Sequence, residues 1–165
     1  MINENSRRER GDSARAGNIA AARTVADIIR STLGPRSMLK MILDPVGGIV
    51  MTNDGNAILR EVDVAHPAAK SVIELARAQD ENCGDGSTSV VVLTGEVIAA
   101  AEPLLGRKIH PIILTQGYAA CLEDILKISE KLAFKVDPND RKIMLRIIDN
   151  CLNTKFSERW GALMC

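Results

Sequence analysis

The chain has 165 residues, a length that fits one domain and allows roughly two-thirds of the unfolded surface to be buried. Its 21 Lys and Arg residues balance its 21 Asp and Glu residues, so it lacks the positive field that binding to a phosphate backbone requires. Aromatic residues make up only 2%, which argues against recognition by base stacking. Together these features exclude nucleic acid as a natural partner.

The first predicted elements are a tail and a helix. Residues 1–16 mix charges of both signs with Ser, Asn and Gly, and such a segment cannot offset the entropy of ordering by burial. We therefore predict a flexible tail over 1–16. Asn18 is a good N-cap type, and aliphatic residues recur at helical spacing from Ile19 to Leu33, which predicts a helix over about 19–32.

A small β-hairpin is predicted next. Residues 40–43 and 49–52 are short β-capable runs separated by a Pro- and Gly-containing turn. Asn53-Asp54-Gly55 reads as a second tight turn. The segment from Ala57 fits either a third strand or a short helix, and we favour the helix.

The rest of the chain is predicted to be helical. Proline in His66-Pro67 opens a helix that runs to about Asp80, and residues 81–86 interrupt it before an apolar helix over 87–101. Pro103 should kink or end that helix. A further helix spans about 111–132, and the last one follows Pro138, with an inner stripe of Ile143, Ile147, Ile148 and Leu152. The fold class is mainly α with a small β-hairpin.

Cysteine usage and hydropathy indicate a soluble protein of the cytoplasm. The four cysteines, Cys83, Cys121, Cys151 and Cys165, show no Cys-x-x-Cys spacing, which favours free thiols in a reducing compartment. The start of the chain lacks the apolar stretch of a signal peptide. The longest apolar run, 90–101, is too short to span a bilayer, so no membrane association is expected.

The segment Gly84-Asp85-Gly86-Ser87-Thr88-Ser89 is the most informative motif. It places glycines and three hydroxyls at the start of a helix, where unpaired N–H groups and the helix dipole favour phosphate. Asp85 is placed to hold Mg²⁺ against phosphate oxygens. The alternative is that Gly-Asp-Gly is only a turn and Ser87 an ordinary N-cap.

Other candidate residues are weaker individually. Leu33-Gly34-Pro35 ends a helix with exposed backbone that could face a nucleotide, although a Gly-Pro helix stop is common. Asp54 could orient a water or a metal ion, or could simply be a turn residue. Lys155, after Asn153-Thr154, could contact a terminal phosphate or only complement a helix dipole. His66 and His110 precede prolines and read as helix caps.

Combined, these segments resemble the group II chaperonins, including the cytosolic complex of eukaryotes. The resemblance rests on TLGPRSMLKMILDPVGGIVMTNDGNAILRE, HPAAKS, AQDENCGDGSTSVVVLTGEV and NTKFSERW, and covers nearly all of residues 17–160. It implies a helical bundle of the equatorial ATP-binding domain, incomplete here, over 17–140 and the start of an intermediate domain over 141–165.

The resemblance also implies roles for individual residues. Leu33, Gly34 and Pro35 would line the nucleotide pocket, Asp85 would bind Mg²⁺, and Gly86, Ser87, Thr88 and Ser89 would hold the phosphates of ATP. Asp54 would assist catalysis near the attacking water, and Thr154 and Lys155 would reach the γ-phosphate. Ser87 stands where the family usually has threonine, which keeps the hydroxyl.

By the same resemblance, a complete subunit would continue past Cys165 into a client-binding apical domain and a return pass that supplies the water-activating aspartate. The expected function is that of part of an ATP-dependent folding chaperone, with other subunits of a hetero-oligomeric double ring as partners. Unfolded clients would bind only through the missing domains. The alternatives are a non-catalytic nucleotide-binding or ring-interaction module, and a partial chain without independent activity.

Overall fold

The computed structural model describes residues 8–34, 36–43 and 47–152. These ranges contain six helices and one two-stranded antiparallel sheet, so the predicted class, mainly α with a small hairpin, is confirmed. The helices are α1 (Gly11–Arg30), α2 (Gly55–Glu61), α3 (Pro67–Cys83), α4 (Ser87–Gly106), α5 (Pro111–Leu132) and α6 (Arg141–Leu152), and the strands are β1 (Lys40–Leu43) and β2 (Ile49–Thr52).

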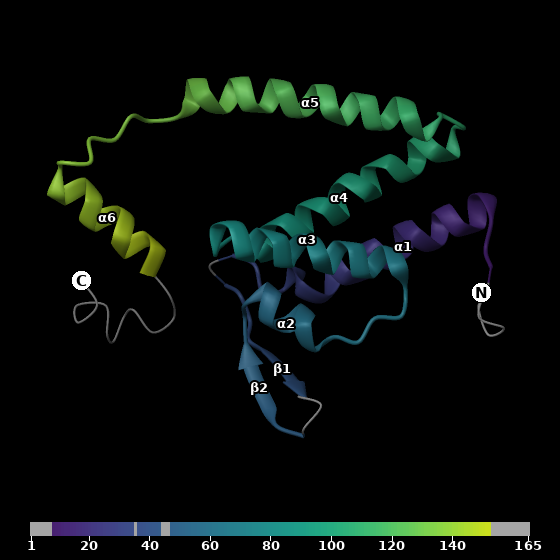
Figure 1. Ribbon diagram of the computed structural model, residues 1–165, viewed down its shortest axis with the longest axis horizontal. Coiled ribbons are helices and arrows are strands. Elements are labelled where there is room, and N and C mark those ends of the chain that lie inside the picture. The colour runs from purple at the N-terminus through teal and green to yellow at the C-terminus, as the bar shows by residue number, and fades with distance from the viewer. Residues whose placement is uncertain (1–7, 35, 44–46, 153–165) are drawn as a thin grey trace. The chain divides into compact units, whose positions relative to one another are not determined.

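The chain divides into two compact units, the first ending at Leu114 and the second beginning at Thr115. In the first unit α1, α3 and α4 pack against one another, and α2 packs on α3 and α4 (Figure 1). Their shared core is aliphatic and consists of Ala22, Val25, Ala26, Ile29, Ile58, Leu59, Ala69, Val72, Ala76 and Val91. The helical spacing of these residues within each element is the reason that one face of each helix is buried.

The hairpin extends from the α2 side of this unit (Figure 1). Strands β1 and β2 pair with Lys40 opposite Thr52 and Leu43 opposite Ile49, and both match the predicted strands. The predicted turn at 53–55 is wrong, because Asp54 is instead the N-cap of α2, and its side chain accepts from the Ala57 amide. The helix favoured after Ala57 is confirmed.

Three predicted helix limits are also wrong. Helix α1 begins at Gly11, so residues 11–16 of the predicted tail are helical and Asn18 lies inside the helix. The apolar period starts only at Ile19, but Ala14 and Ala16 are strong helix formers and an Arg15–Asp12 ion pair of 3.0 Å supports the first turns. Helix α3 continues past Asp80 to Cys83, because it stops only where Gly84 can adopt a left-handed conformation.

Helix α4 passes through Pro103 and ends at Gly106 instead of 101. Proline has no backbone N–H, so Pro103 removes one intrahelical hydrogen bond. Because Pro103 lies in the last turn of α4, the helix ends shortly after this loss. Within the described ranges α4, with 20 residues, is also the one helix whose length and composition would suffice to cross a bilayer, so the apolar helix is longer than the predicted run of 90–101. Core helices of soluble domains share this property, and Val91, Gly95 and Ala101 of α4 are buried.

The helices α5 and α6 form as predicted but leave their apolar stripes uncovered. None of the residues of α5 is buried, and Ile125 and Leu126 are more than half exposed. In α6 the predicted inner residues Ile143, Ile147 and Ile148 are between 36% and 42% exposed.

Candidate functional site at the start of helix α4

The loop between α3 and α4 is built from two glycines in the left-handed region. Gly84, with φ of 71°, closes α3 by donating its N–H to the Asp80 carbonyl, and Gly86, with φ of 79°, is the N-cap of α4. Other residues would be strained at both positions. Since the N-cap is a glycine, it has no side chain to cap the first amides of α4, which remain oriented out of the helix start.

The three hydroxyls that follow have different surroundings. Ser87 is buried, and its hydroxyl donates to Asp54 Oδ1 at 3.5 Å. Thr88 Oγ1 accepts from the Gly55 amide at 3.1 Å, which leaves its hydroxyl proton available to another acceptor. Ser89 is exposed. Two of the three predicted phosphate contacts therefore also tie α4 to the start of α2.

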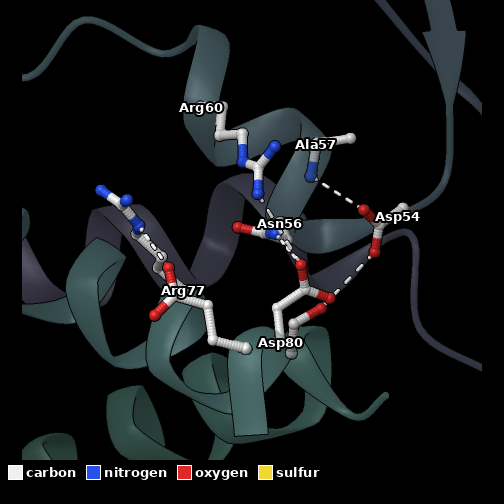
Figure 2. Close-up of polar contacts among 8 residues, drawn as sticks. Asp54, Asn56, Ala57, Arg60, Arg77 and Asp80 are labelled. Carbon is white, nitrogen blue, oxygen red and sulfur yellow. Dashed lines mark hydrogen bonds and ion pairs between the residues drawn. The ribbon is translucent and has the colours of Figure 1, made fainter. Parts of the chain in front are cut away.

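Asp54, the N-cap of α2, contacts Ser87 at the start of α4, although the two residues are 33 positions apart in sequence. Its Oδ2 accepts from the Ala57 amide at 2.9 Å, and its own amide donates to Thr52 Oγ1 at 3.1 Å. The carboxylate is thus held by the local helix start, through its contact with Ala57 (Figure 2), while its other oxygen accepts from the Ser87 hydroxyl. The structure thus brings Asp54 next to Ser87 and Gly55 next to Thr88.

Asp85 is exposed and lies at the centre of the loop. Its Oδ1 accepts from the Gly86 amide at 2.7 Å, and its carbonyl accepts from Gln79 Nε2 at 3.0 Å. No group of three or more His, Cys, Asp or Glu side chains gathers anywhere in the described ranges. These residues therefore do not form a metal site from protein ligands alone. One carboxylate beside open helix amides fits Mg²⁺, which is commonly held by one or two carboxylates together with phosphates.

The remaining predicted residues lie elsewhere or outside the described ranges. Leu33 and Gly34 follow α1, where Gly34 has φ of 94° and Leu33 is 45% exposed. No hydrogen bond within the described ranges joins these two residues to the 84–89 segment. Pro35, Thr154 and Lys155 lie outside the described residues. His66 caps α3 by accepting from the Ala68 amide at 3.2 Å, which confirms the reading of that residue as a cap.

A polar pair beside the site was missed by the sequence analysis. Asn56, in the first turn of α2, is only 4% exposed and donates its Nδ2 to Asp80 Oδ2 (Figure 2). Arg60 Nη2 lies 3.8 Å from the same carboxylate oxygen. The available signal was an asparagine two residues before the apolar Ile58 and Leu59, but burial of an asparagine is recognised only when the partner helix is known.

The arginine Arg77, near the end of α3, has a raised pKa because Glu81 hydrogen-bonds to its guanidinium at 2.9 Å and adds an opposite charge. Arg60 and Arg77, both drawn in Figure 2, are each paired with a carboxylate. Both are mostly exposed, so these pairs contribute little to stability.

Comparison with known proteins shows one family over most of the chain. Residues 25–165 match the TCP-1/cpn60 chaperonin family. The chain is 55% identical over 99% of its length to T-complex protein 1 subunit gamma of Oxytricha granulifera, 54% over its full length to that of Schizosaccharomyces pombe and 52% over its full length to that of Mus musculus.

These matches cover 29%, 31% and 30% of the relatives' own lengths, so the chain spans less than a third of the proteins it matches. The predicted resemblance to group II chaperonins is confirmed by the extent of the match. The family match covers most of the sequence, including every element that builds the site, and therefore the chain belongs to the TCP-1/cpn60 chaperonin family.

Proposed function

We propose that the chain is part of a subunit of the ATP-dependent chaperonin of the cytoplasm and that it binds Mg·ATP at the start of α4. The observation that carries the proposal is the glycine-flanked start of α4, with Asp54 of the α2 cap 3.5 Å from Ser87. A helix N-terminus of small residues accepts phosphate, and the neighbouring Asp85 supplies a ligand suited to Mg²⁺.

In this proposal each residue acts through its own atoms. The amides of Ser87, Thr88 and Ser89 and the free hydroxyl proton of Thr88 donate to phosphate oxygens, and Gly86 lets the phosphate approach the backbone. Asp85 contributes its second carboxylate oxygen to Mg²⁺, since Oδ1 already accepts from Gly86. Leu33, Gly34 and Pro35 line the nucleotide, Thr154 and Lys155 reach the γ-phosphate, and Asp54 orients the attacking water. When bound, ATP would supply a γ-phosphoryl group for transfer to water in a complete subunit.

The proposed partners are the other chaperonin subunits of a hetero-oligomeric double ring. Unfolded clients would be bound by parts of the subunit that lie beyond these 165 residues, given that the chain spans less than a third of its relatives.

A second candidate function is a ring-interaction or nucleotide-binding module without turnover. It is favoured by the exposed apolar side chains of the hairpin, where Met41, Leu43 and Ile49 are each more than 60% exposed. Exposed apolar surface of this kind marks a surface that another chain or segment covers.

Calorimetric titration of the 165-residue chain with Mg·ATP tests the proposal. We expect saturable heat from one site. The absence of heat, together with no difference between the unmodified chain and Lys155→Ala, would contradict nucleotide binding and favour a partial chain without independent activity.

We expect the same chain to show at most trace ATP turnover. Phosphoryl transfer depends on positioning water and stabilising charge, and the family resemblance assigns the water-activating aspartate to a return pass that these residues do not contain. A phosphate-release assay on the purified chain checks this. Robust turnover that Asp85→Ala abolishes would refute the view that the missing aspartate is essential.

A further inference from the structure

The start of α2 holds Asp54 in place through contacts that the proposed function does not itself use. The Asp54 Oδ1 to Ser87 Oγ distance of 3.5 Å is at the limit of a hydrogen bond, so this contact alone fixes the carboxylate poorly. Other contacts between α2 and the α3–α4 region must set the position of Asp54.

Two such contacts are made by the two residues that follow Asp54 in sequence. The Gly55 amide donates to Thr88 Oγ1 at 3.1 Å, and Asn56 Nδ2 donates to Asp80 Oδ2. The first joins α2 to α4 and the second joins α2 to α3. Asn56 is almost fully buried, whereas the Asp80 side chain is 32% exposed. A hydrogen bond from a buried amide to a carboxylate is stronger than a hydrogen bond between two neutral groups.

Asp80 also connects to the loop through its main chain. Its carbonyl accepts from the Gly84 amide at 2.8 Å, the hydrogen bond that closes α3 and begins the 84–86 loop. The same residue therefore fixes the origin of the proposed phosphate loop with its backbone and the start of α2 with its carboxylate (Figure 2).

We infer that Asn56 and Asp80 form a positioning pair that sets the distance between the Asp54 carboxylate and the start of α4, and so tunes the affinity of the site for Mg·ATP. The inference rests on the proposed function. Neither residue touches the nucleotide in this scheme. The pair acts through Asp54 and the loop.

Three variants test the pair. Asn56→Asp removes the donor and sets two carboxylates against each other. Asp80→Ala removes the acceptor and, because Asp80 is one-third exposed, leaves water to satisfy Asn56. The exchange Asn56→Asp with Asp80→Asn restores a donor and an acceptor at the original net charge. Asn82→Asp, at an exposed position in the last turn of α3, adds the same charge as Asn56→Asp without touching the pair.

We expect Asn56→Asp and Asp80→Ala each to weaken Mg·ATP binding about tenfold, the size found when residues supporting a ligand are removed. The exchanged pair and Asn82→Asp should stay within about twofold of the unmodified chain. The two single variants change the net charge in opposite directions, so a purely electrostatic effect on an anionic ligand would have opposite signs. If both single variants weaken Mg·ATP binding and the exchanged pair restores it, the two residues act by positioning.

Hydrogen exchange without nucleotide gives a second measurement. The Gly55 amide reports the contact of α2 with α4, while the Ala57 amide reports only the local cap by Asp54. Both single variants should accelerate exchange at Gly55 but not at Ala57, at a temperature where circular dichroism shows complete folding. If Asn56→Asp does not fold, Asp80→Ala and the exchanged pair carry the comparison.

The outcomes separate the inference from the proposed function. Unchanged Gly55 exchange and unchanged Mg·ATP affinity in a folded Asp80→Ala variant would overturn the positioning pair while leaving nucleotide binding intact. Absence of Mg·ATP heat in the unmodified chain would overturn the proposed function and the effect of the pair on affinity, whatever the Gly55 exchange shows.

Discussion

Replacing Gly95 with leucine is expected to lower the free energy of unfolding by about 3 kcal/mol or more. Gly95 is buried in α4, and a Cβ added there would lie 2.4 Å from the Cβ of Ala26 in α1, a residue that is itself fully buried. No side chain fits unless α1 and α4 separate, and separation would expose the core formed by Val25, Ile29 and Val91. Urea denaturation of the monomeric chain measures the change.

The ion pairs along the same contact cannot compensate for that loss. Arg23 pairs with Glu102 at 3.0 Å, and Arg30 pairs with Glu96, which raises the pKa of Arg30. All four side chains are about half exposed, and exposed pairs typically contribute about 0.2–1 kcal/mol.

Gly106→Ala is the matched control, because Gly106 lies in the same helix and an added Cβ would meet nothing within 4 Å. Alanine has fewer accessible conformations than glycine in the unfolded chain, so Gly106→Ala should raise the free energy of unfolding by about 0.4–1 kcal/mol. Equal effects at the two glycines would show that α1 and α4 do not approach as closely as the structure has them.

Asp85→Asn is expected to weaken Mg·ATP binding at least about tenfold, or about 1.4 kcal/mol. In the unmodified chain the Gly86 amide donates to Asp85 Oδ1 at 2.7 Å. Asparagine keeps an oxygen that can accept this hydrogen bond, so the loop should keep its conformation. The negative charge that attracts Mg²⁺ is lost. The affinity for ATP without Mg²⁺ should not fall, because the variant removes a negative charge near the phosphates.

Asp63→Asn is the control for charge, since Asp63 is exposed in the connection between α2 and α3. It should leave the Mg²⁺ dependence unchanged. Calorimetry with and without Mg²⁺ distinguishes the cases, and an equal loss of affinity in the presence and absence of the metal ion would rule out Asp85 as its ligand.

Local sequence signals predicted most of the fold. Apolar spacing, together with proline and glycine at the limits of the elements, predicts the helices α3, α4 and α5 and the two short strands. The start of α1 was missed because residues 11–16 carry no apolar face, and yet alanine and an i, i+3 ion pair extend a helix without one. Burial governs the apolar period, whereas propensity governs where an exposed helix begins.

The candidate site was predicted only in part. The glycines and hydroxyls of 84–89 are recognisable locally, because their chemistry depends on one short segment. The contacts of Asn56 with Asp80 and of Gly55 with Thr88 join residues distant in sequence. The close fit of Gly55, where an added Cβ would lie 2.4 Å from Thr88 Oγ1, depends likewise on tertiary packing, which one sequence does not display.

The most direct test of the account is a crystal structure of the chain, or of a chaperonin assembly that contains it, with Mg²⁺ and a non-hydrolysable ATP analogue. We predict phosphate oxygens within hydrogen-bonding distance of the amides of Ser87, Thr88 and Ser89, with Mg²⁺ bound to Asp85. A nucleotide bound elsewhere, with the start of α4 free of phosphate, would contradict the proposed site even though membership of the family would stand.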